Sequence, residues 1–205
     1  TAADCALLDA VLCGAPLDLE PLLLPGLRVG VPGPLFWQNL DPEVQRAGQA
    51  VLAALQNAGV VLVDCDVGIT VDQCNQTGMA IAMGETLASL RDYLASHGQP
   101  FDAVHFAARI ASADVRAIVS TLLAPAPDTL ATYQQALTQQ RTALQKAFAD
   151  CFDRHRLDAL VFPTAPRPAA RIGEDDNVML NGEAVSTFFT FTRNVGPGSV
   201  AGLPG

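Results

Sequence analysis

Apolar residues in the first third of the chain form two short runs that flank one amphipathic stretch. Residues 27–32 are largely apolar and end at Pro32, which is typical of a buried strand. Residues 41–58 repeat apolar positions at helical spacing after an Asp-Pro-Glu start, a sequence that caps free N–H groups and fits the first helical turn. Residues 60–63 form a second apolar run. This order predicts a strand–helix–strand unit with parallel strands.

The later segments add helices, one strand and one hairpin. Helical spacing of apolar residues predicts a helix at 2–13 and mostly helical structure at 70–122. A further long helix is predicted from Asp128 to Phe152, and the apolar run 159–162 predicts a third buried strand. Proline- and glycine-rich stretches predict loops or breaks at 16–25, 98–100 and 125–127.

Alternating residues from Val178 to Val185 surround the pair Asn181-Gly182, which is the signal of a hairpin with a type I′ turn. The last stretch, 186–205, holds three phenylalanines and several glycines but no clear period. Taken together, the order of elements predicts an α/β fold.

Composition narrows the range of partners. Half of the 205 residues are apolar and 16% are charged, so the chain can bury a large core and is expected to carry apolar surface that other protein covers. The net charge is −9 and no basic stripe occurs, which argues against nucleic acid and anionic membranes as partners. We find no signal peptide and no apolar run of about 18 residues, so no membrane span is predicted.

Cysteine and histidine spacing gives no sign of a disulfide framework, a metal site or another cofactor. The five cysteines are odd in number and widely spaced, which predicts reduced thiols that pack as small apolar residues in a cytoplasmic protein. The three histidines are isolated in the sequence. These residues are Cys5, Cys13, Cys65, Cys74, Cys151, His97, His105 and His155.

Candidate catalytic residues are few. Ser199 stands outside any G-x-S-x-G motif and has no partner visible in the sequence. Lys146, the one lysine, falls off the apolar face of its predicted helix, so it is interpreted as a solvated surface residue and not as a buried base. Glycines near the C-terminus allow two interpretations, a tight turn or the wall of a pocket. They are Gly196, Gly198, Gly202 and Gly205.

Six segments, taken in order, resemble motifs of the amidase signature family. They are TAADCALLD (1–9), GLRVGVP (26–32), DPEV (41–44) with Leu55, Gly59 and Val60, the helical segment 133–141, DALVFPTAP (158–166), and NGE (181–183) followed by 189–194 and GLPG (202–205). The ordered set covers nearly the whole chain. Its Thr-Phe-Thr-Arg-Asn run and its hairpin resemble the indoleacetamide and mandelamide hydrolase branch.

This resemblance implies a mixed, largely parallel sheet flanked by helices, as part of the amidase signature fold. It also implies hydrolysis of a small carboxamide, such as an aryl-acetamide, through an acyl-enzyme. In the family a serine attacks the carbonyl, a second serine on a cis peptide bond relays protons to a neutral lysine, and a glycine- and serine-rich loop holds the oxyanion.

Those catalytic groups precede the helix that residues 1–9 resemble, and Lys146 does not match the family lysine. No catalytic residue is therefore assigned, and the segment alone is expected to be inactive. The chain starts without Met and stops after a glycine-rich turn. Residues 1–205 are accordingly expected to be the C-terminal portion of a single amidase domain, truncated at both ends.

By resemblance, the segment supplies scaffold and one wall of the substrate pocket. The expected substrate-binding residues are Thr164, Phe191, Arg193, Asn194, Gly196 and Pro197. Packing of the core and of the turn is the alternative role for the same residues. The expected partners are a small-molecule amide and either a second copy of the chain or the N-terminal part of the domain.

Two other classes of function stay open. The chain could be a catalytically inactive, truncated amidase-like module that binds a partner or a small aromatic molecule. It could also be an unrelated α/β regulatory domain. A strand order without the parallel pair 27–32 and 60–63 would favour the regulatory domain.

Overall fold

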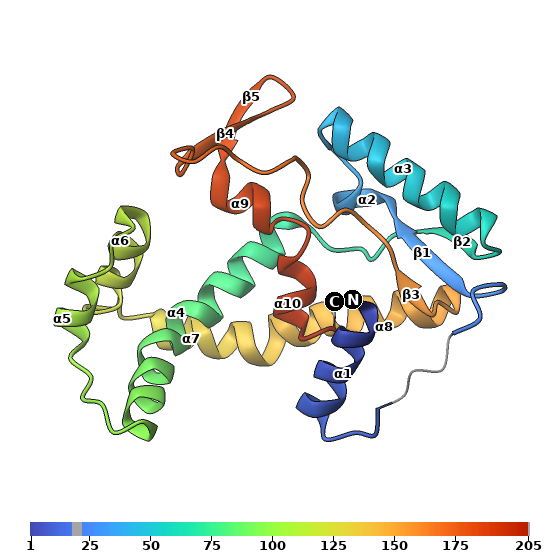
Figure 1. Cartoon of the computed structure of the whole chain (residues 1–205). Coiled ribbons are helices and arrows are strands. Elements are labelled where there is room, and N and C mark those ends of the chain that lie inside the picture. Colours follow the sequence, from blue (N-terminus) through green and yellow to red (C-terminus); the bar gives the residue numbers. More distant parts are fainter. Residues whose placement is uncertain (18–21, 205) are drawn as a thin grey trace.

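A computed structural model describes residues 1–17 and 22–204 (Figure 1). Residues 18–21 of the loop predicted at 16–25, and Gly205 of the GLPG segment, lie outside the described residues. Among the helices described, none is both long and apolar enough to cross a membrane.

A three-stranded parallel sheet forms the centre of the α/β fold. Its strands are β1 (Arg28–Pro32), β2 (Val61–Cys65) and β3 (Ala159–Leu160), in the order β2-β1-β3. β1 pairs in parallel with both neighbours. The strand–helix–strand prediction is therefore confirmed, and the strand order that would have favoured an unrelated regulatory domain is not found.

β3 is shorter than the predicted strand 159–162. Val161 still donates a backbone hydrogen bond to the Gly30 carbonyl, at 2.9 Å. Its own carbonyl accepts a hydrogen bond from the indole nitrogen of Trp37, at 3.1 Å. This side-chain partner takes the place of a strand partner, and the chain leaves the sheet before Pro163.

Helices cover both faces of the sheet (Figure 1). α3 (Pro42–Asn57) packs against β2 on one face, and the Asp41 side chain caps it by accepting a hydrogen bond from the backbone of Glu43, as the sequence predicts. α8 (Arg141–His155) packs against β2 on the opposite face.

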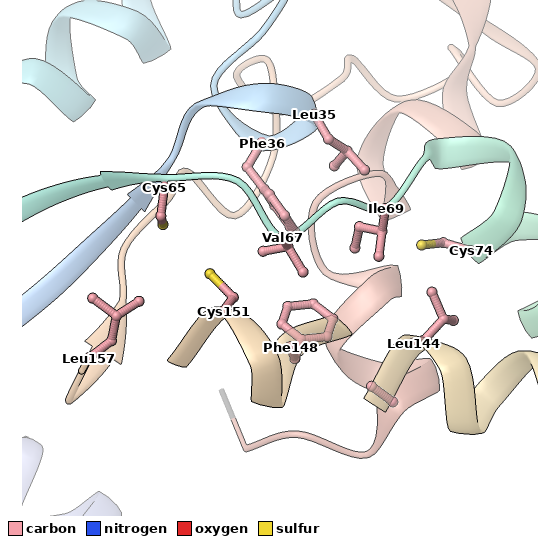
Figure 2. Close-up of a cluster of buried hydrophobic side chains, with 11 residues drawn as sticks. Leu35, Phe36, Cys65, Val67, Ile69, Cys74, Leu144, Phe148, Cys151 and Leu157 are labelled. Carbon is pink, nitrogen blue, oxygen red and sulfur yellow. The ribbon is translucent and has the colours of Figure 1, made fainter. Parts of the chain in front are cut away.

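The hydrophobic core lies between the sheet and α8. Figure 2 shows Phe148 and Cys151 of α8 pointing towards Cys65 and Val67 at the end of β2. Phe36, from the short helix α2 (Gly33–Phe36), joins them and stacks on Phe162 with ring centroids 4.3 Å apart. The inward face of α8 is thereby fixed against the sheet.

A pair of long helical segments extends from this core. α4 (Val71–Ser96) packs against α7 (Thr129–Gln135) and the π-helical turn η1 (Ala136–Gln140), which continues into α8. The long helix predicted from Asp128 is thus confirmed, with a π-turn that periodicity did not indicate. Between α4 and α7 lie α5 (Ala103–Ala108) and α6 (Ala113–Thr121). The predicted breaks at 98–100 and 125–127 bound this pair, whereas the break between α5 and α6 was not predicted.

An antiparallel hairpin, β4 (Asn177–Leu180) and β5 (Glu183–Ser186), follows β3 in the chain. Asn181 and Gly182 both have positive φ, 51° and 89°, as the predicted type I′ turn requires. The stretch without a clear period then forms two short helices, α9 (Thr187–Thr192) and α10 (Gly196–Ala201).

The N-terminal helix α1 (Ala2–Cys13) presents its apolar side chains to solvent. Leu8, Val11 and Leu12 are 59%, 70% and 76% exposed. A monomer rarely leaves such a contiguous apolar face uncovered. The face therefore matches the expected apolar surface that other protein covers.

The cysteines divide into two groups. Cys65, Cys74 and Cys151 are buried, and Figure 2 shows Cys65 and Cys151 facing each other. Cys5 and Cys13 are exposed on α1, so the expectation that all five pack as apolar residues is wrong for these two. Burial raises the pKa of Cys65 to about 12 and that of Cys74 to about 11.

We predict that two thiols of the folded chain react with a disulfide reagent at pH 8, and that all five react after denaturation. The buried thiols are shielded from the reagent, whereas those of α1 are exposed to it. Unfolded thiols ionise from about pH 9, whereas Cys65 and Cys74 of the folded chain ionise only at higher pH. The free energy of unfolding should therefore fall as the pH rises from 9 towards 12. Replacing Cys5 and Cys13 by serine should abolish the fast reaction. A third fast-reacting thiol in the parent chain would contradict the burial of Cys65, Cys74 and Cys151.

Candidate substrate pocket

A cavity of about 760 Å³ lies beside the short strand β3. One wall is α8, through Phe148 and Phe152. The strand and the segment after it contribute Leu160 and Phe162, and the opposite wall is α10 with the residues that flank it. Elements far apart in the sequence thus converge on one hollow.

Aromatic rings dominate the α8 side of the cavity. Phe148 and Phe152 lie four residues apart, so both project from the same side of the helix. Phe162 adds a third ring from beyond β3. Rings of this kind bury large areas and pack favourably against another ring, so the cavity suits a flat apolar group.

Asn194 ties the α10 side of the cavity to α2 and to the segment after β3. Its side chain is wholly buried, and its amide nitrogen donates to the carbonyls of Phe36, at 2.9 Å, and Pro163, at 2.6 Å. Its amide oxygen accepts from Nε of Arg193, at 2.9 Å. Both N–H groups are therefore engaged by the protein, and the residue holds the pocket in shape.

The α10 wall resolves the two interpretations of the glycines. Gly198 lines the cavity together with Ser199 and Leu203, as the pocket-wall interpretation expects. Gly202 ends α10 in the left-handed conformation, with φ at 76°, as the tight-turn interpretation expects. Gly196 lies in the first turn of α10 and is not among the residues that line this cavity.

The structure brings only part of the expected substrate-binding set to the cavity. Thr164 and Asn194 both line it. Phe191, Arg193, Gly196 and Pro197 are not among its lining residues. Their role in binding stays a prediction.

The surroundings of these four residues differ. The guanidinium of Arg167 lies 6.0 Å from the Phe191 ring centroid, and Pro197 is buried. Burial lowers the pKa of Arg193, and its Nη2 is buried without a hydrogen-bond partner among the residues that the structure describes.

Sequence reasoning missed two of the aromatic residues that line the cavity. Phe148 and Phe152 follow the apolar period of the predicted helix, which by itself is typical of residues that face a core. Their position at the end of the stripe, beside a strand that soon ends at a proline, is the signal that could have indicated a pocket. Ser199 was noted only as a serine without a partner.

The described residues hold little catalytic chemistry. Lys146 is 71% exposed and pairs with Asp150 at 2.6 Å, as its interpretation as a surface residue predicts. Asp158 lines the cavity, but its carboxylate accepts a hydrogen bond from the backbone of Arg28. Within residues 1–17 and 22–204, no group of three or more His, Cys, Asp or Glu side chains could hold a metal ion.

The fold and pocket together define an α/β protein that can receive a small apolar molecule beside a parallel sheet. Residues 21–205 match the family described as Amidase, and the chain belongs to that family. It is 37% identical over 203 residues to an indoleacetamide hydrolase of Agrobacterium vitis, which covers 99% of this chain and 44% of that enzyme. A mandelamide hydrolase of Pseudomonas putida is 29% identical over 216 residues, covering 98% of this chain and 40% of that enzyme.

Solved structures share the fold. A crystal structure of an amidase superposes with a TM-score of 0.73 at 22% identity, over 97% of this chain and 41% of its own. A bacterial aryl acylamidase of the amidase signature family superposes with a TM-score of 0.61 at 18% identity, over 87% of this chain and 36% of its own. The chain therefore spans less than half the length of these relatives, and the expected family and fold are confirmed.

We predict that Asn194→Ala lowers the free energy of unfolding by about 2–4 kcal/mol. The substitution leaves two inward-facing carbonyls without donors and opens a void. Asn57→Ala, at an exposed position on α3, is the matched control and should change stability by less than about 0.5 kcal/mol. Urea denaturation measures both, and an equal effect of the two would contradict the tie.

Proposed function

We propose that residues 1–205 are the C-terminal portion of a single amidase domain that hydrolyses the C–N bond of a small aryl-acetamide. The chain supplies the scaffold and one wall of the substrate pocket. The aromatic cavity beside β3, closed by Thr164, Asn194 and α10, is the observation that carries this proposal. We propose the same acyl-enzyme route that the family resemblance implies.

The named relatives support this substrate class. The relatives include indoleacetamide and mandelamide hydrolases, and a structural neighbour is an aryl acylamidase. Each of these names joins an amide to an aromatic group. A cavity lined by Phe148, Phe152 and Phe162 fits the ring of such a substrate.

The nucleophile and base are proposed to come from protein outside these residues. Lys146 is exposed, pairs with Asp150 and does not line the cavity, so it is not placed to act as a base there. Among the strands that the structure describes, β3 lies at an edge of the sheet, and α1 has an exposed apolar face. The rest of an amidase domain, or a second copy of the chain, would cover these two surfaces. The three buried thiols, all of them free, fit a cytoplasmic location.

A catalytically inactive binding module is the alternative. It would use the same cavity and the same aromatic wall. Binding of an aryl amide to the chain is common to both functions, so only restoration of hydrolysis separates them.

We predict that phenylacetamide binds the chain and that Phe152→Ala weakens binding by at least about tenfold. The substitution removes a ring that contributes roughly 1.5–3 kcal/mol of apolar burial. Ligand-observed NMR measures the dissociation constant. Phe188→Ala, which truncates a 56% exposed ring outside the cavity, is the matched control and should leave binding unchanged. Equal affinities for all three proteins would argue against the cavity as the binding site.

A chimera tests the enzymatic part of the proposal. The segment of the Agrobacterium vitis indoleacetamide hydrolase that aligns with this chain is replaced by residues 1–205, and release of ammonia from indoleacetamide is followed. Hydrolysis by the chimera, with none by the chain alone, is expected for an amidase scaffold. A folded chimera that binds the amide without hydrolysing it would favour the binding module.

A further inference from the structure

Two side chains of α8 hold the α10 wall of the cavity by hydrogen bonds. Nε of Arg141 donates to the Val200 carbonyl, and Nε2 of Gln145 donates to the Ala201 carbonyl, both at 2.9 Å. These carbonyls belong to the last turn of α10, where no intrahelical donor remains. The positive charge of Arg141 also suits the negative end of the helix dipole.

Gly202 lets Arg141 approach this closely. A Cβ at position 202 would lie 2.9 Å from Nη2 of Arg141, so a side chain there would push the guanidinium away. The same residue ends α10 in the left-handed conformation. Directly after it, Leu203 and Pro204 line the cavity. Arg141 therefore lies against the turn that joins α10 to the rim of the pocket.

α4 supports α10 from another direction. A Cβ at Gly78 would lie 2.9 Å from a methyl carbon of Val200, so the absence of a side chain allows the two helices to touch. α10 packs against both α4 and α8. Val200 is thus held by Gly78 through its side chain and by Arg141 through its carbonyl.

The π-turn η1 directs Arg141 to this position. Tyr133 packs over Gly84 of α4, and Arg141 follows it by eight residues. In a regular α-helix, eight residues would leave the two side chains about 80° apart. A turn with i→i+5 hydrogen bonds contains more residues and reduces that offset. The side chains of Tyr133 and Arg141 consequently both lie on the side of the helix that faces α4 and α10.

We propose that Arg141, presented by the π-turn, is a positioning residue that sets the distance between α10 and the aromatic face of α8. Arg141 does not line the cavity; it acts through Gly198 and Ser199, which do. A wall held at one distance discriminates between ligands by their thickness and length. Arg141 thereby determines selectivity for ring-bearing over short aliphatic amides, an inference that rests on the proposed function.

The test compares phenylacetamide with isobutyramide on the 205-residue chain by ligand-observed NMR. Arg141→Met should weaken phenylacetamide binding about tenfold and change isobutyramide binding by less than about twofold, since a displaced wall mainly costs the larger ligand its contacts. The affinity of Arg141→Lys for phenylacetamide should fall between those of the parent chain and Arg141→Met, because the ammonium can still donate to the Val200 carbonyl. Arg154→Met, on the exposed side of the same helix, is the matched control and should match the parent chain.

Gly78→Ala provides a second route to the same result, because its methyl group displaces Val200 from the α4 side. It should reduce the selectivity ratio while every α8 side chain stays in place. An unchanged ratio in Arg141→Met, at a temperature where far-ultraviolet circular dichroism shows it folded, overturns the positioning role. If the ratio is unchanged and the parent chain binds phenylacetamide, only this inference fails. If the parent chain does not bind phenylacetamide, the proposed pocket fails as well.

Discussion

The buried amide of Asn194 is the contact on which the shape of the pocket depends. Its two N–H groups and its oxygen connect α2, the segment after β3, and the turn between α9 and α10. Along the chain, α2 lies about 160 residues from Asn194, and the segment after β3 lies about 30 residues from it. Because carbonyls without donors are costly inside a protein, this one side chain keeps three segments in a single arrangement.

α8 links that arrangement to the sheet. Cys151 and Leu144 face the core under β2, while Phe152 turns to the cavity, and Phe148 contributes to both. A shift of the helix would therefore disturb the core and the pocket together. Walls made by packed helices move less than walls made by loops, which is the property that a size-selective site requires.

The sequence indicated the features that depend on neighbouring residues. The parallel pair β1 and β2, helix α3 with its Asp41 cap, and the turn at Asn181 follow from local spacing and local chemistry. The features it missed depend on distant contacts. β3 ends early because Trp37 binds the carbonyl of Val161, and residues 136–140 carry an ordinary helical pattern although tertiary packing draws them into a π-turn.

The pocket was only half predictable for the same reason. Thr164 and Asn194 were expected there through family motifs, but the rings of Phe148 and Phe152 carry no motif and become pocket residues only through the position of α10. This leads to a division of labour within the proposed amidase. Recognition of the ring needs aromatic walls at a fixed distance, which the described residues provide. Chemistry needs an activated nucleophile, and the solvated Lys146 cannot act as its base. Binding of the ring and attack on the amide would then take place together only where this pocket faces the remainder of the domain.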